Sequence, residues 1–105
     1  MIVTFAETYL RNLYETGKTT EKKHRFQPEI VRKYKQRINL MRQVVDTNAL
    51  KKYHGLNFEN LQGDKKGVLS IRVDSKYRIE FTVTDNNVEP LATICNIIKL
   101  SNHYK

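Results

Sequence analysis

Cysteine, proline and glycine are scarce in this sequence, and tryptophan is absent. The 105 residues include one cysteine, two prolines and four glycines. A lone cysteine, Cys95, excludes an internal disulfide and a cysteine-based metal site, and because it stands in an apolar run we expect a packed core thiol. The sequence also lacks the ~20 apolar residues of a membrane span and the charged start and apolar block of a signal peptide. We therefore expect a cytoplasmic protein.

Acidic side chains are also few relative to basic ones. The chain has 19 Lys and Arg against 11 Asp and Glu, which gives a formal net charge of +8. This surplus favours a polyanionic partner, an acidic protein partner, or both, although a merely soluble basic domain has the same composition. The length and an apolar content of 39% fit one globular domain over residues 1–105, with a single core.

The clearest local pattern is a pair of runs, residues 68–73 and 77–84, that alternate apolar and polar side chains. This is the period of half-buried strands, and the short polar connection between them predicts an antiparallel hairpin. If both apolar sets face one core, Arg72 lies opposite Arg78 on the polar face. Like charges across a ladder repel each other, so the pair indicates either an anion site or neutralisation by Glu80. Because Arg78 is expected to point away from the core, its removal should leave the fold intact.

Helical spacing of apolar residues predicts two helices before the hairpin. The first begins near Phe5 and ends at Gly17, a typical C-terminal cap. The second begins at Pro28, which suits a first helical turn, and its apolar stripe runs to Val45, so that the helix ends near Asp46. Basic residues fill much of its remaining circumference, either as a solvated face or as a surface for RNA backbone or the ribosome. They are Arg32, Lys33, Lys35, Arg37 and Arg42.

Three shorter segments complete the expected architecture. Residues 2–4 form either an edge strand or the lead-in to the first helix. Residues 85–87 carry a strong turn signal. Residues 91–100 are apolar on both faces, which is typical of an interior strand covered on both sides.

Three segments and one residue together resemble a known family: residues 61–67 (Leu-Gln-Gly-Asp-Lys-Lys-Gly), 70–73, 77–81 and a histidine near the C-terminus, His103. The combination resembles the HigB branch of the RelE-type toxins, also called plasmid maintenance system killer proteins, over nearly the whole chain. The resemblance implies an α+β, RelE-like fold, with N-terminal helices packed on one face of a small antiparallel β-sheet. It also implies a type II toxin, an endoribonuclease that cleaves mRNA on the ribosome, and a helix-turn-helix antitoxin of the HigA type encoded beside it.

The resemblance also assigns roles to individual residues. Arg78 matches the arginine that binds the scissile phosphate in the family, and His103 matches the C-terminal histidine. Arg72 matches a position that is often basic. Lys65 and Lys66 match the basic loop and are expected to hold RNA backbone, as is Lys76 in the hairpin turn, with a solubilising turn as the alternative.

Metal-independent RNA cleavage needs a base for the ribose 2′-OH, cations for the charge that builds on the phosphorane, and an acid for the departing 5′-oxygen. Arg72 and Arg78 suit the second task because a guanidinium group stays charged and its fork matches phosphate oxygens. His103 is the natural acid or base. Glu59 is the second candidate if it lies over the same face, and a surface carboxylate paired with a lysine is the alternative. We expect no metal and no cofactor, because the histidines lack ligand spacing and no glycine-rich loop precedes a helix.

Three positions depart from the family pattern. Many relatives have His where this chain has Glu59, Lys where it has Gln62, and Tyr where it has Asn102. Two other functions therefore stay open: a ParE-like inhibitor of DNA gyrase, and an RNA-binding relative without catalytic groups. The presence of both Arg78 and His103 favours the nuclease.

Overall fold

Apart from its first strand, the chain places helices before strands. The structure is a computed structural model that describes residues 1–86 and 92–102. The helices there are α1 (Thr8–Glu15), α2 (Pro28–Gln43) and α3 (Thr47–Lys51), with short 3₁₀ turns at Lys22–His24, His54–Leu56 and Gly63–Lys65. The strands are β1 (Ile2–Phe5), β2 (Glu59–Asn60), β3 (Leu69–Arg72), β4 (Arg78–Asn86) and β5 (Ala92–Ser101).

The strands form one sheet in the order β1-β5-β4-β3-β2. Strand β1 pairs with β5 in parallel, whereas the other three pairings are antiparallel. The sheet is therefore mixed, because the helices between β1 and the later strands let the chain return to β1 in the same direction. Strand β1 is an edge strand of the sheet, and β5 is an interior strand, as its two apolar faces predicted. The α+β fold is confirmed, and the one departure from the expected antiparallel sheet is the parallel pairing of β1 with β5.

The hairpin has the predicted register. Ile71 lies opposite Ile79, and Arg72 lies opposite Arg78. The turn is closed by Asp74, whose Oδ1 accepts hydrogen bonds from the backbone N–H groups of Lys76 (2.8 Å) and Tyr77 (2.7 Å). An aspartate that binds the backbone of its own turn is a common way to fix a tight connection.

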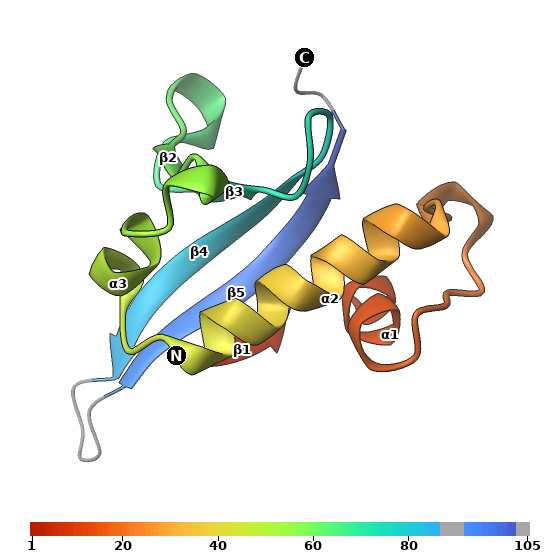
Figure 1. Ribbon diagram of the computed structural model, residues 1–105, viewed down its shortest axis with the longest axis horizontal. Coiled ribbons are helices and arrows are strands. Elements are labelled where there is room, and N and C mark those ends of the chain that lie inside the picture. Colours follow the sequence, from red (N-terminus) through yellow and green to blue (C-terminus); the bar gives the residue numbers. More distant parts are fainter. Residues whose placement is uncertain (87–91, 103–105) are drawn as a thin grey trace.

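Helices α1 and α2 pack on one face of the sheet, as Figure 1 shows, with α2 lying across it. The two helices are tied together by the buried hydroxyl of Tyr34, which donates to the carbonyl oxygen of Leu10 at 2.8 Å. The core between helices and sheet consists of fully buried apolar side chains. They include Leu10, Leu13, Tyr34, Ile38, Met41, Ile71, Ile79, Phe81, Cys95 and Ile97.

Helix α1 begins at Thr8 and not near Phe5, because Phe5 is the last residue of β1 and pairs with Ile97. Two further predicted boundaries are wrong. Helix α2 ends at Gln43, and Val45 is 77% exposed. The reason is that Asp46 caps the next helix, α3, by accepting from the N–H of Ala49 at 2.9 Å. At the other boundary, Asp85 and Asn86 belong to β4 and pair with β5, so the rest of the predicted turn and Leu91 lie outside the described residues.

Candidate active site

The candidate site lies on the face of the hairpin that points away from the core helices. Along β3 and β4 this face carries the polar residues that alternate with the core residues. Although polar, Ser70, Arg78 and Glu80 are only 0%, 4% and 2% exposed, and Ser101, opposite Arg78 on β5, is 1% exposed. The face is therefore a covered polar cluster near β3. Arg78 lies on the face away from the core helices, as its register predicted, but it is buried there.

Arg78 is held by acceptors from two segments. Its Nε donates to the Ser70 hydroxyl at 2.9 Å, and its Nη2 donates to the Ser70 carbonyl at 3.2 Å and to the Asn57 carbonyl. Asn57 ends the 3₁₀ turn before β2 in a left-handed conformation, with φ 47°. The turn that ends at Asn57 thus brings a backbone acceptor onto the guanidinium, which fixes its orientation.

Glu80 is paired with the basic loop. The Lys65 ammonium lies 3.1 Å from Oε1 and 2.9 Å from Oε2 of Glu80, whose side chain is only 3% exposed. A carboxylate this deeply buried needs a charged partner, and Lys65 supplies one. Lys65 therefore fastens the loop to the sheet, whereas its neighbour Lys66 is exposed.

Arg72 and Arg78 are not equivalent, although they lie opposite each other. Arg72 is exposed, and its Nε donates to the Asp74 carbonyl at 3.0 Å. The exposed Lys76 follows in the same turn. Of the two arginines that the sequence places opposite each other, Arg72 is thus an accessible cation near the turn and Arg78 is a buried cation on the strand.

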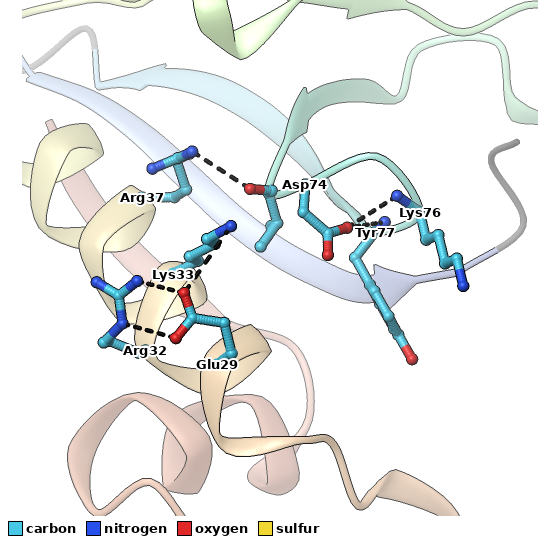
Figure 2. Close-up of polar contacts among 8 residues, drawn as sticks. Glu29, Arg32, Lys33, Arg37, Asp74, Lys76 and Tyr77 are labelled. Carbon is cyan, nitrogen blue, oxygen red and sulfur yellow. Dashed lines mark hydrogen bonds and ion pairs between the residues drawn. The ribbon is translucent and has the colours of Figure 1, made fainter.

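Arg37 of α2 is a residue that the sequence analysis did not single out. Its Nε donates to the Arg72 carbonyl at 3.0 Å and its Nη2 to the Val73 carbonyl at 3.2 Å. Figure 2 shows Arg37 reaching from the helix toward the hairpin turn, apart from the Glu29, Arg32 and Lys33 ion pairs. Burial lowers the pKa of Arg37, and the nearby charge of Arg72 lowers it further. In the sequence Arg37 is one basic residue among five on its helix, so only the tertiary contact distinguishes it.

The two proton-transfer candidates are placed differently. Glu59 is exposed on β2 and lies directly opposite Ser70. Residues directly opposite each other share a face of the sheet, so Glu59 is on the same face as Arg78. His103 lies outside the described residues.

Over residues 1–86 and 92–102, no group of three or more His, Cys, Asp or Glu side chains is arranged to hold a metal ion. None of the helices described is long and apolar enough to span a bilayer.

Comparison with known proteins places the chain in a family and finds solved structures of similar fold. A family model described as the RelE-like toxin of the type II toxin-antitoxin system HigB matches residues 3–93. A solved structure, a YoeB/ParE toxin from Agrobacterium tumefaciens, is similar with a TM-score of 0.56 and 18% sequence identity, over 99% of this chain and 100% of that chain. At this identity the structural likeness shows the fold alone. A search of curated proteins found no match. The family match covers the basic loop and the hairpin and stops before His103.

Proposed function

Because the chain belongs to the HigB-like family of RelE-like type II toxins, we propose that it is a ribosome-dependent endoribonuclease that cuts mRNA and is held inactive by a helix-turn-helix antitoxin. The observation that carries the proposal is the family match over the basic loop and the hairpin, where cations and a carboxylate gather on one face of the sheet. We propose that cleavage is metal-independent and proceeds by attack of the ribose 2′-OH on the adjacent phosphate.

In this proposal the cations have different roles in binding and cleavage. Exposed Arg72, Lys66 and Lys76 hold the RNA backbone, and Arg72 delivers the phosphate to the polar cluster. Arg78 then stabilises the charge on the phosphorane, since its guanidinium is already oriented by Ser70 and Asn57 and needs little reorganisation. Because Arg78 is covered, this contact requires the Asn57 carbonyl to give way to a phosphate oxygen. Lys65 keeps the loop against the sheet through Glu80.

Glu59 and His103 are the proposed proton-transfer pair. Glu59 lies on the correct face, beside the Ser70 that binds Arg78. A carboxylate and an imidazole together supply the base for the 2′-OH and the acid for the 5′-oxygen, and positioned groups of this kind contribute roughly 10²–10⁴-fold each.

A ParE-like inhibitor of DNA gyrase is the second candidate, and the burial of Arg78 favours it. An arginine that is 4% exposed and donates to Ser70 and Asn57 is also what a purely structural role requires. An inhibitor or a catalytically inactive RNA-binding relative needs no accessible catalytic cation.

The test is cleavage of mRNA by the purified protein on programmed ribosomes. The proposal expects new ends inside coding regions that carry a 5′-hydroxyl and a 2′,3′-cyclic phosphate, because the 2′-OH attacks and the 5′-oxygen leaves. Arg72→Ala should slow cleavage, whereas Lys52→Ala, a control at the exposed end of α3, should not. Intact messages together with loss of gyrase supercoiling would establish the inhibitor instead.

A further inference from the structure

A single surface turn covers Arg78. It consists of the 3₁₀ turn His54–Leu56 and the residue that ends it, Asn57, and it contacts β3 (Figure 1). We call residues 54–57 the Asn57 turn. Its residues are exposed except Leu56, which is 4% exposed and anchors the turn in the core. A Cβ at Gly55 would meet no atom within 4 Å, so the turn has room to move outward at that residue.

Asn57 has an uncommon backbone conformation. Its φ is 47° and its ψ is 55°, and it is the only residue other than glycine with a positive φ in the described part of the chain. An L residue in this left-handed conformation is disfavoured by roughly 5- to 30-fold relative to the right-handed one, although asparagine tolerates it better than most residues. Such conformations persist where surrounding contacts impose them, and they cluster at ligand clamps and switch regions.

The contact that this conformation makes is with the buried guanidinium group of Arg78. The Arg78 Nη2 donates to the carbonyl oxygen of Asn57, whose own N–H donates to the His54 carbonyl at 3.1 Å within the turn. A carbonyl oxygen is a neutral acceptor, whereas an anionic oxygen makes hydrogen bonds to a guanidinium group that are roughly twice as strong. The carbonyl therefore occupies, with a weaker acceptor, a position that suits an oxyanion.

We propose that the Asn57 turn is an autoinhibitory cover, which opens when an RNA phosphate replaces the Asn57 carbonyl on Arg78. In the closed state the left-handed conformation of Asn57 keeps its carbonyl on the guanidinium group. In the open state Asn57 leaves that conformation, and the Arg78 Nη2 donates to a phosphate oxygen instead. The inference rests on the proposed nuclease function for the identity of the ligand. It goes beyond that function by assigning a closed resting state to the free protein.

A cover of this kind favours an RNA strand over small phosphates. The apparent affinity for phosphate falls in proportion to the fraction of molecules that are open, and a small anion gains only its own contact with Arg78. In the proposed complex an RNA strand also contacts exposed cations around the hairpin, and binding energy from such remote contacts drives the opening. These exposed cations are Lys66, Arg72 and Lys76. The free protein should therefore bind inorganic phosphate weakly at Arg78.

The first experiment measures binding of inorganic phosphate at Arg78 through the NMR signal of its Nε–H group, which Arg78→Lys identifies by removing it. Two variants shift the cover in opposite directions, because Asn57→Gly favours the left-handed conformation and Asn57→Ala disfavours it. We expect Asn57→Ala to bind phosphate at least ~5-fold more tightly than Asn57→Gly, although it melts at a lower temperature. If the contact were purely structural, the less stable variant would bind phosphate no better.

Gly17→Ala is the matched control, because Gly17 also has a positive φ, +78°. A Cβ there would meet Lys35 and Val31 of α2, so the substitution imposes a similar backbone penalty outside the Asn57 turn. Its melting temperature should fall, as that of Asn57→Ala does, whereas its phosphate affinity at Arg78 should equal that of the wild type. The control thus separates opening of the turn from a general loss of stability.

A second experiment measures access to Arg78 without a phosphate ligand. Phenylglyoxal modifies accessible guanidinium groups, and mass spectrometry of peptides locates the modified arginines. Arg78 is 4% exposed, so its modification requires opening, whereas the exposed Arg72 serves as an internal reference in every variant. Relative to Arg72, we expect modification of Arg78 to be at least ~5-fold faster in Asn57→Ala than in Asn57→Gly. The rate in Gly17→Ala should equal that of the wild type.

Equal phosphate affinity or equal Arg78 modification in Asn57→Ala and Asn57→Gly would overturn the cover, and so would an effect of the same size in Gly17→Ala. If Asn57→Ala does not fold, Asn57→Gly is compared with the wild type. It should keep the site closed more of the time and slow the modification of Arg78 by ~3-fold or more. An unchanged or faster rate would then overturn the proposal.

The same variants distinguish failure of the cover from failure of the nuclease. A protein that cleaves no mRNA, but whose access to Arg78 depends on residue 57 as expected, refutes the nuclease and supports the cover. A nuclease whose Arg78 is equally accessible in all variants refutes only the cover.

Discussion

Replacement of Arg78 by alanine separates the structural role of this residue from its proposed catalytic role. The substitution removes hydrogen bonds from a buried cation to the Ser70 hydroxyl and to the Ser70 and Asn57 carbonyls. A hydrogen bond from a charged group contributes about 1.5–3 kcal/mol, and the contributions overlap. The acceptors left behind are neutral and buried, and each one without its donor costs about 1–3 kcal/mol, so the total is about 3–5 kcal/mol.

This loss is a large part of the total stability, since small domains unfold at a cost of about 5–15 kcal/mol. At about 4 °C or more per kcal/mol, the melting temperature of Arg78→Ala should fall by at least ~12 °C. The sequence alone led to the opposite expectation, an intact fold, because Arg78 was expected to point away from the core. Arg72→Ala is the matched control, because Arg72 is exposed and its Nε donates to the Asp74 carbonyl at the surface. Its cost should stay below ~1 kcal/mol.

The assay pairs urea unfolding with single-turnover cleavage on programmed ribosomes, at a temperature where each variant is folded. Cleavage by folded Arg78→Ala should be slower by ~10²–10³, the usual cost of losing one preorganised donor to a developing oxyanion. Arg78→Lys should recover part of both losses, because an ammonium keeps the charge and loses the fork. A wild-type melting temperature would refute the argument from burial. Wild-type cleavage by the folded variant would refute the catalytic assignment and leave Arg78 as a structural residue.

Three further outcomes are expected. Lys65→Ala removes the hydrogen bonds of a half-exposed ammonium to the buried Glu80 carboxylate, so it should destabilise the protein by ~1–3 kcal/mol in urea unfolding. Lys66→Ala, at an exposed position, should change stability by less than ~0.5 kcal/mol. Arg37→Ala removes two hydrogen bonds to the hairpin and should cost ~1–3 kcal/mol, with faster amide exchange confined to the turn. Burial raises the pKa of the Cys95 thiol from 9.0 to about 11. The protonated thiol therefore contributes to the free energy of unfolding below pH 9, and this contribution is lost as the pH rises to about 11. The urea midpoint of the wild type should fall over this range, and Cys95→Ala should lack the fall.

The hairpin was predictable because residues close together in the sequence determine its strands and its register. Alternating side chains fix which face of each strand is buried, and with two buried faces only one register is available. The pairing of Arg72 with Arg78 follows from that register and is observed. The end of α2 was not predictable from its apolar stripe, because Val45 continues the pattern and Asp46 overrides it by capping α3.

The candidate site was predictable in its composition and not in its contacts. The sequence indicates which cations gather near the hairpin, but the acceptor that covers Arg78 comes from Asn57, 21 residues away. The partner of Glu80 is 15 residues away, and the carbonyls that bind Arg37 are 35 and 36 residues away. Contacts at such separations depend on how loops lie over the sheet, and the alternation of apolar and polar residues in the sequence does not indicate them. The sequence therefore could not distinguish the exposed Arg72 from the covered Arg78.

The position of β5 in the sheet determines when this protein can fold during its synthesis. Strand β5 is late in the sequence, yet it lies between β1 and β4, and β1 has no other partner in the described sheet. The first strand must therefore wait, unpaired, until residues 92–101 have left the ribosome. Folding that depends on such distant contacts is slow to begin and cannot be completed on a partial chain. A nascent chain should accordingly lack the complete sheet, and with it the activity proposed above, until residues 92–101 have emerged.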